Sequence, residues 1–103
     1  MPAAVVVLST FPDEARAADI ARALVEARLA ACVNLVAGAR SIYRWQGATE
    51  EAREVLAVIK TTSERLEALR ARLIELHPYE LPEVIAVPVV GGHAAYLDWI
   101  ATG

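Results

Sequence analysis

The 103-residue sequence predicts an α+β domain of the ferredoxin-like class, in which the split βαβ order β-α-β-β-α-β is followed by one further helix. Two observations predict this class. Apolar, β-branched segments alternate with segments whose apolar residues repeat at helical spacing, and two of the strand-like segments follow each other with only a turn between them. The length suits a single domain over residues 1–103, because domains commonly contain about 100–150 residues.

The first strand and the first helix are predicted over 3–10 and 11–31. The segment "AAVVVLST" is continuously apolar and β-branched, which is typical of a strand buried on both faces. Pro12 and acidic residues then follow, as at many helix N-termini. Ile20 and Leu24 start an apolar stripe at helical spacing that continues to the end of this segment.

A long hairpin is predicted from two further strands, 32–47 and 50–62. Gly38 interrupts the first of them and is expected to mark a bulge or a bend. Gly47 opens the turn that joins the two strands.

The last part of the chain predicts a helix over 63–77, with Ser63 as its N-cap, and a strand over 84–90. Pro88 lacks a backbone donor, so we expect this part of the strand to lie at a sheet edge or a bulge. The segment 91–103 predicts a short amphipathic helix.

The apolar content exceeds what a small single chain usually carries. Hydrophobic residues make up 56% of the sequence, against about 45–50% in typical soluble domains. No apolar run approaches the roughly 20 residues that cross a bilayer, and the first residues lack the basic region of a signal peptide. The strands also lack the alternation of apolar and polar residues that is typical of a sheet with one solvent-exposed face. We therefore expect sheet-to-sheet association in a homo-oligomer and no membrane contact.

Charge and cysteine content narrow the expected partners and location. The net charge of −3 and the absence of a basic run argue against nucleic-acid binding. Cys32 is the only cysteine, which excludes an intrachain disulfide and favours a reducing cytoplasm.

The segment "HPYELPEV" (77–84) is the best metal candidate. His77 could supply an imidazole, and Glu80 and Glu83 could supply oxygen ligands, within a loop that two prolines stiffen. The alternative is that His77 only satisfies carbonyl groups at the end of a helix, because none of the usual metal-binding spacings is present.

A second set of residues could contact a small anionic ligand: Tyr43, Trp45, Lys60 and Tyr79. Large aromatic side chains near a single lysine could line a cleft, although Tyr and Trp are also common at subunit interfaces. No nucleophile with a base, phosphate loop or dinucleotide fingerprint occurs, so the sequence does not predict an enzyme.

Five segments together resemble the CutA family of divalent-cation tolerance proteins: "VVLSTFPDEARAADIARALVEARLAACVN", "SIYRWQG", "VIKTT", "HPYELPEV" and "YLDWI". The resemblance covers nearly the whole chain. It implies a ferredoxin-like fold and a very stable cytoplasmic homotrimer similar in assembly to the PII signalling proteins. It also implies that the long hairpin reaches across to neighbouring subunits.

The resemblance further implies a link to copper or other divalent ions. Bacterial members place a cysteine at the end of the first strand and a His-His pair before "PY", with a glutamate of "PE" as a further proposed ligand. Here these positions hold Ser9, Leu76, His77 and Glu83, so only His77 and Glu83 remain as metal ligands. Weak binding of Cu²⁺ or another divalent cation is expected. The alternative function is a PII-like sensor of small molecules, or a signalling scaffold, with sites at intersubunit clefts.

Overall fold

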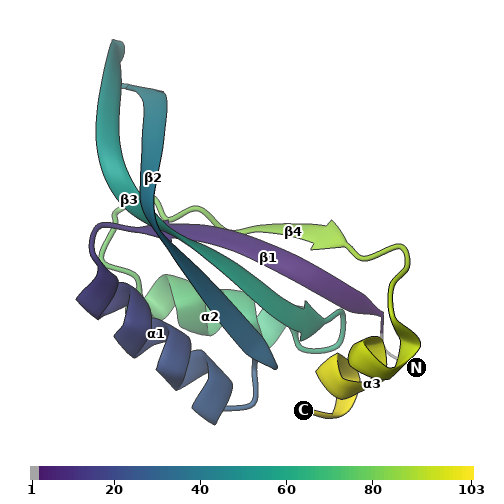
Figure 1. The fold of residues 1–103 in the computed structure, drawn as a ribbon. Helices are drawn as coiled ribbons and strands as arrows, with labels where there is room; N and C mark the ends of the chain where they lie inside the picture. Colours follow the sequence, from purple (N-terminus) through teal and green to yellow (C-terminus); the bar gives the residue numbers. More distant parts are fainter. Residues whose placement is uncertain (1–2) are drawn as a thin grey trace.

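The computed structural model describes residues 3–103 and confirms the predicted order of strands and helices (Figure 1). The elements are β1 (Ala4–Phe11), α1 (Glu14–Glu26), β2 (Cys32–Trp45), β3 (Ala48–Thr62), α2 (Leu66–Leu76), β4 (Ile85–Pro88) and α3 (Ala94–Thr102).

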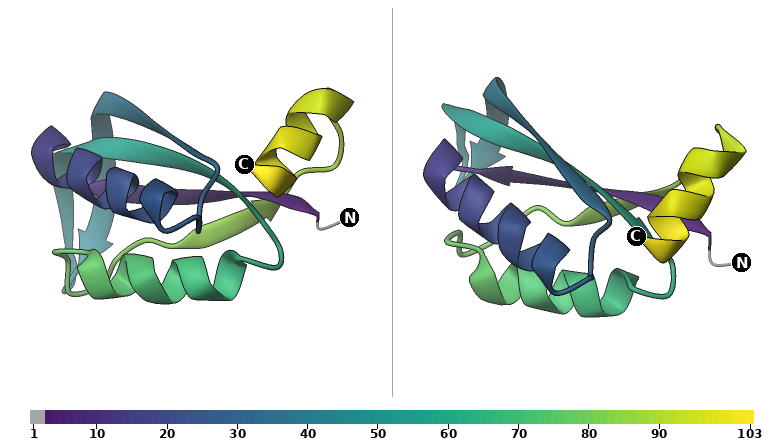
Figure 2. Two further views of the ribbon diagram at one scale, coloured as in Figure 1. Left: turned by 90° about the horizontal axis from the view of Figure 1, so that it is seen from below. Right: turned by 60° about the horizontal axis from the view of Figure 1, so that its bottom comes forward.

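The four strands form one antiparallel sheet in the order β2-β3-β1-β4. Helices α1 and α2 lie side by side on one face of this sheet, and α3 lies near the end where the chain begins (Figures 1 and 2). The second half of β2 and the first half of β3, which meet at the hairpin turn, project beyond the helices as an arm (Figure 1). The element order therefore produces a mixed α/β fold in which one sheet face carries the two long helices.

The core lies between the sheet and helices α1 and α2. Alternate residues of β1 and β3 point into it, and they meet apolar side chains of both helices. The fully buried side chains with less than 2% exposure include Val7, Ile59, Leu24, Leu69 and Leu73. This alternation corrects one expectation: within the single chain, β1 is buried on one face only.

The opposite face of the sheet carries a patch of apolar residues that is only partly covered. Its residues are half-buried on β1 and β3 and exposed on β2 and β4, and the strand register places them next to one another. We call this surface the open face; it consists of Val6, Leu8, Val36, Leu56, Val58, Ile85 and Val87. Figure 2 shows α1 and α2 on the other side of the sheet.

Both predicted glycine features of the hairpin are confirmed. The register between β2 and β3 shifts between Val36 and Ala39, and Gly38 has a φ of 80° at this bulge. Gln46 and Gly47 both have positive φ and form a two-residue turn, as expected for a tight hairpin. Pro88 ends β4, which is an edge strand, so its missing donor faces no partner strand.

Three helix boundaries differ from the prediction: both ends of α1 and the start of α2. Helix α1 begins after Asp13, whose carboxylate accepts a hydrogen bond from the Arg16 backbone N–H at 2.8 Å, and it ends before residue 28 because Arg28 has a φ of 61°. Helix α2 begins after Arg65, not Ser63, because residues 63–65 form a turn in which the Arg65 N–H donates to the Thr62 carbonyl.

Arg65 joins α2 to the end of α3. Its guanidinium donates to the carbonyls of Ile100 at 3.3 Å and Ala101 at 3.0 Å, two acceptors that the last turn of a helix leaves without intrahelical donors. We expect Arg65→Ala to lower the free energy of unfolding by about 1–2 kcal/mol, because charge-assisted hydrogen bonds of this kind contribute about that much. Urea unfolding measures the change, with Arg22→Ala on α1 as the control. Unchanged hydrogen exchange in α3 would contradict this role.

Candidate functional site

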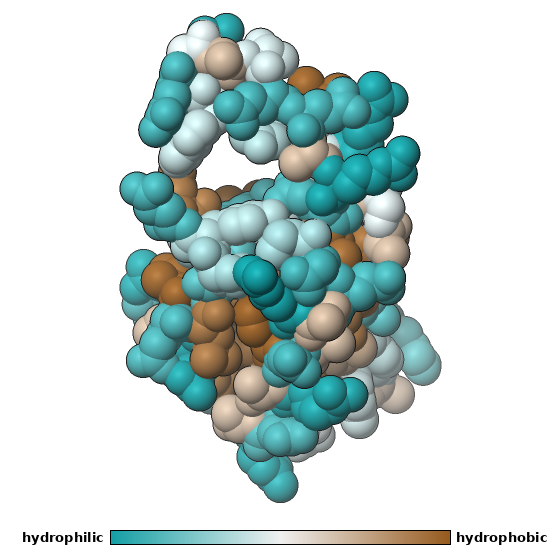
Figure 3. All heavy atoms as spheres, turned by 90° about the vertical axis from the view of Figure 1, so that its left-hand side faces the viewer, coloured by the Kyte–Doolittle hydropathy of each residue, from teal (hydrophilic) through white to brown (hydrophobic). Residues whose placement is uncertain are grey.

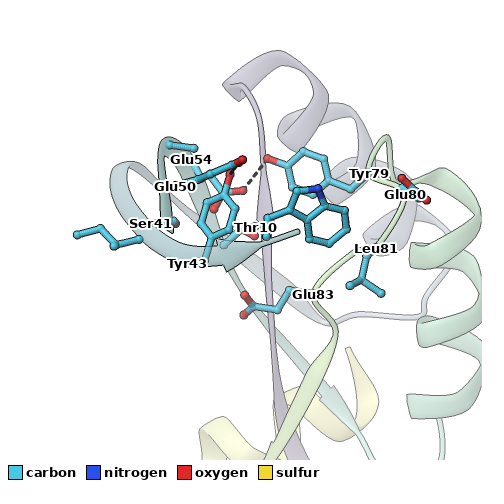
Figure 4. Close-up of a pocket in the computed structure, with 12 residues that line it drawn as sticks. Thr10, Ser41, Tyr43, Glu50, Glu54, Tyr79, Glu80, Leu81 and Glu83 are labelled. Atoms are coloured by element: carbon cyan, nitrogen blue, oxygen red, sulfur yellow. Dashed lines mark hydrogen bonds between the residues drawn. The ribbon is translucent and has the colours of Figure 1, made fainter. Parts of the chain in front are cut away.

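A pocket of about 790 Å³ opens between the hairpin and the loop that follows α2 (Figure 4). Figure 3 shows an opening in the surface below the tip of the hairpin, surrounded mainly by hydrophilic and neutral residues. The lining residues come from β1, β2, β3 and the loop: Thr10, Ser41, Ile42, Tyr43, Trp45, Glu50, Ala52, Glu54, Tyr79, Glu80, Leu81 and Glu83.

Three aromatic side chains line this pocket. Tyr43 and Trp45 alternate along β2 and therefore share one side of the strand, and Tyr79 comes from the loop. Tyr43 is 40% exposed, Trp45 is 36% exposed and Tyr79 is partly exposed. Their rings are therefore accessible to a ligand. The structure thus brings together three of the four residues in the predicted ligand cleft, whose binding role stays a prediction.

Four carboxylates surround the same space: Glu50, Glu54, Glu80 and Glu83. Among the described residues, no basic side chain lines the pocket. Within residues 3–103, the ion pairs all involve other acidic residues, namely Asp13, Glu51, Glu67 and Glu75. The pocket therefore has an uncompensated negative charge, which attracts cations and repels anions.

Two tyrosine hydroxyl groups donate to these carboxylates. The Tyr79 hydroxyl donates to Glu54 Oε2 at 2.6 Å, and the Tyr43 hydroxyl donates more weakly to Glu50 Oε1 at 3.4 Å. Burial raises the pKa of Tyr79. The hydrogen bond to Glu54 and the negative charge of Glu54 raise this pKa further. Burial and the neighbouring Glu50 also raise the pKa of Tyr43. Both phenols therefore stay protonated as donors, and the first bond ties the loop to β3.

His77 lies behind this loop with both ring nitrogens bonded. Nδ1 accepts a hydrogen bond from the Tyr79 backbone N–H at 3.1 Å, so Nε2 carries the proton and donates to the Thr10 carbonyl at 2.8 Å. The ring stacks on Phe11 with 4.7 Å between centroids and is only 8% exposed. Burial lowers the pKa of His77, against the opposing effects of the Thr10 carbonyl and Glu54. Burial therefore favours the neutral imidazole, and the two hydrogen bonds leave it no free lone pair in this state.

The two predicted metal ligands therefore differ in their surroundings. Glu83 lines the pocket, whereas His77 does not. Residues 3–103 contain no group of three or more His, Cys, Asp or Glu side chains placed to hold a metal ion. Ser9 is fully buried with its hydroxyl unbonded within this part of the chain, and Leu76 packs against the core. The role of His77 and Glu83 as metal ligands stays a prediction.

Lys60 lies away from the other three cleft residues. It follows Glu54 by six positions on β3, which is roughly 20 Å along an extended strand. Its Nζ bonds the Asn34 side chain and lies 6.0 Å from the centre of the Tyr96 ring. Within this chain, Lys60 therefore supplies no positive charge to the pocket.

Sequence reasoning missed Glu50 and Glu54. A signal for Glu50 was present, because a two-residue turn at Gln46 and Gly47 fixes the cross-strand partner of Tyr43 as Glu50. The place of Glu54 in the pocket depends on the bulge in β2 and on the path of the loop after α2. The hairpin turn alone does not predict either of these features.

Comparison with known proteins identifies the family. The sequence model of the CutA1 divalent ion tolerance protein family matches residues 5–103. The chain belongs to this family. The divalent-cation tolerance protein CutA of Thermus thermophilus is 53% identical over 95 residues, which cover 92% of each chain. Human Protein CutA is 53% identical over 91 residues, which cover 88% of this chain and 51% of the human protein.

Solved structures of family members have the same fold. The T. thermophilus structure superposes with a TM-score of 0.93 at 50% identity and covers 96% of both chains. The CutA1 structure from Oryza sativa also gives a TM-score of 0.93, at 38% identity over 96% of this chain and 91% of that chain. In the described part of our chain, no helix is both long and apolar enough to cross a membrane.

Proposed function

We propose that this divalent-cation tolerance protein binds divalent cations weakly in the pocket beside the hairpin, and that its role is binding, not catalysis. The observation that supports this proposal most directly is the set of four carboxylates that line one open space and have no basic partner within residues 3–103. Glu83 is the proposed ligand that the sequence and the pocket share. Because no three ligating side chains converge in residues 3–103, bound ions keep most of their water and the affinity is low.

The donor set determines which cations are preferred. Carboxylate oxygens and water suit Mg²⁺, Ca²⁺ and Mn²⁺, whereas copper gains most from imidazole and thiolate ligands. Ser9 offers no thiolate, and His77 can bind Cu²⁺ only after Nδ1 releases the Tyr79 N–H or Nε2 loses its proton and releases Thr10. We therefore propose that Cu²⁺ binds through His77 only at the cost of loosening the loop.

Calorimetric titrations with Mn²⁺ and Cu²⁺ test this function. We expect weak Mn²⁺ binding that Glu83→Gln reduces severalfold, while Glu64→Gln, an exposed carboxylate outside the pocket, leaves binding unchanged. Electron paramagnetic resonance of the Cu²⁺ complex then shows whether a nitrogen ligand is present, which a loss of affinity in His77→Ala alone does not show. No binding of either ion to the wild-type protein would exclude the proposed site.

We also propose that the chain is a single ferredoxin-like domain that assembles as a cytoplasmic homotrimer. The order β2-β3-β1-β4, with β3 between β1 and β2, supports the ferredoxin-like class. The open face supports assembly, because its contiguous apolar residues need cover that this chain does not supply. Light scattering of the purified protein measures the mass directly, with three times 11.1 kDa expected.

A PII-like sensor of small molecules is a second candidate function, favoured by one specific observation. The three aromatic side chains and the volume of about 790 Å³ suit an organic ligand better than a bare metal ion. From the sequence we expected a small anionic ligand. Because the lining is negatively charged, we propose a cationic ligand instead. Small-molecule binding that raises the melting temperature would support this candidate.

A further inference from the structure

We propose that the hairpin arm binds a second copy of this chain through charge: the basic side of one arm packs on the acidic side of the next arm. The arm consists of the second half of β2 and the first half of β3, and it projects beyond the helices (Figure 1). This inference goes beyond cation binding. It rests on the proposed trimer and names the surfaces and ion pairs that join its chains.

One side of the arm is basic. The strand register places Arg40 directly opposite Arg53, and like charges in this position destabilise a strand pair. The Arg40 guanidinium donates to Glu51 at 2.6 and 3.2 Å, whereas Arg44 and Arg53 form no ion pair within residues 3–103. The single chain therefore leaves this side without enough negative charge. We call this surface the basic side; by alternation along the two strands it consists of Arg40, Ile42, Arg44, Glu51 and Arg53.

The other side of the arm is acidic and aromatic. The Tyr43 hydroxyl donates across the strand pair to Glu50, and both side chains lie on this side (Figure 4). Glu54 lies there too, two positions before Leu56 of the open face on the same strand. We call this surface the acidic side; it consists of Ser41, Tyr43, Trp45, Glu50, Ala52 and Glu54.

Assembly through the open face brings the acidic side into the interface as well, because the two surfaces are continuous along β3. Burying a carboxylate without a basic partner is strongly unfavourable. Within residues 3–103, Glu50 and Glu54 have no such partner. The neighbouring chain must therefore supply basic groups at this position, and the unpaired arginines of its arm are suited to do so.

The two sides also satisfy the symmetry of a ring. A ring of identical chains requires two different, complementary surfaces on each chain. The arm presents them on opposite sides, because successive side chains of a strand point in opposite directions. In a ring of three, each basic side covers one acidic side. Arginines of one chain then pair with Glu50 and Glu54 of the next, and they can stack on the rings of Tyr43 and Trp45.

The exposed position of the arm is an independent argument for this contact. A two-stranded ribbon alone is marginally stable at best in water. Helices α1, α2 and α3 lie away from the arm, and Ile42 on its basic side is 63% exposed (Figures 1 and 2). In the ring, each arm lies between two others, so both of its sides gain packing.

Reversal of charge tests the inference. We expect Arg44→Glu/Arg53→Glu and Glu50→Arg/Glu54→Arg each to raise the dissociation constant of the trimer at least about tenfold, because like charges then face each other at three equivalent contacts. The chain with all four substitutions should regain the trimer, since its two sides are complementary again. Light scattering over a dilution series measures dissociation, and circular dichroism shows whether each chain is folded.

A matched control makes the same change in net charge elsewhere. Arg22 lies on α1 and Arg28 follows it, both exposed and on the helix side of the sheet, so Arg22→Glu/Arg28→Glu should retain the trimer. Salt dependence gives a second measurement that needs no reversed charge. Raising the ionic strength from about 0.05 M to about 0.5 M should weaken the wild-type trimer, because screening reduces the attraction between the two sides. In Arg44→Gln/Arg53→Gln, most of this dependence should be lost.

The other outcomes separate this inference from the proposals on which it rests. A wild-type protein that is a single chain overturns both the trimer and the inference. A trimer that is unchanged in the reversed variants, or equally salt-dependent in Arg44→Gln/Arg53→Gln, overturns the inference alone. So does a folded four-substitution chain that stays dissociated.

A polyanion is the other possible occupant of the basic side. If Arg44→Glu/Arg53→Glu retains the trimer but is no longer retained on a heparin column, the basic side binds a polyanion and the inference is overturned. Titration of Glu83→Gln with Mn²⁺ tests the proposed cation site separately, because Glu83 belongs to the loop and not to the arm.

Discussion

Replacing Ile85 by lysine is expected to dissociate the proposed trimer into single chains. Ile85 is 53% exposed in the single chain and lies beside Leu8 on the open face. In the assembled protein, the substituted ammonium group would be buried without a partner, at a cost of several kcal/mol per site. A symmetric trimer repeats this cost at three equivalent positions, so one substitution weakens the whole assembly three times over.

A matched control separates this effect from a general effect of surface charge. Ile74 is 48% exposed on α2, away from the open face, so Ile74→Lys should retain the trimer. Light scattering gives the mass of each variant, and circular dichroism shows whether the dissociated chain remains folded. A trimeric Ile85→Lys protein would mean that this edge of the open face is not part of the interface.

The strands and the hairpin could be predicted because local features determine them. The β-branched runs, Gly38 and Gly47 act over a few residues, so their consequences can be read from neighbouring positions. The two ends of α1 and the start of α2 were not predicted correctly. Helix α2 begins after a turn over 63–65, and the Ser63 N–H in this turn bonds the carbonyl of Ala3, a residue about sixty positions away in the sequence.

The candidate site also combines features that neighbouring residues predict with features that depend on residues far apart in the sequence. Alternation along β2 placed Tyr43 and Trp45 on one side of the strand, and the structure has them there. The surroundings of His77 depend on Thr10 and Phe11, which only the folded chain brings next to it. Sequence reasoning left two roles of His77 open, metal ligand and partner of carbonyl groups at the end of its helix, whereas its ring bonds the Thr10 carbonyl of β1 and the Tyr79 N–H. The structure shows the backbone bonds, and the loop built on them carries Tyr79 to Glu54.

Replacing His77 by phenylalanine is expected to lower the free energy of unfolding by about 2–4 kcal/mol. Phenylalanine can keep the stack on Phe11 but cannot accept from the Tyr79 N–H or donate to the Thr10 carbonyl, and each lost partner of a buried polar group costs about 1–3 kcal/mol. Because the Tyr79 N–H bond anchors the loop, the hydrogen bond from the Tyr79 hydroxyl to Glu54 should weaken as well. Denaturant unfolding measures the loss, and His93→Gln before α3 is the control.

The pH dependence of stability provides the sharper test of the neutral imidazole. Burial lowers the pKa of His77 in the folded protein, so the unfolded chain takes up the proton first as the pH falls. The contribution of His77 to stability is therefore complete above its ordinary pKa of about 6.5 and decreases as the pH falls below that value. Protonation also removes the Nδ1 lone pair, so the Tyr79 N–H loses its acceptor. The wild-type protein and His93→Gln should lose stability in this range more steeply than His77→Phe. Equal slopes in all three proteins would contradict the lowered pKa, because they would mean that folding does not change proton binding by His77.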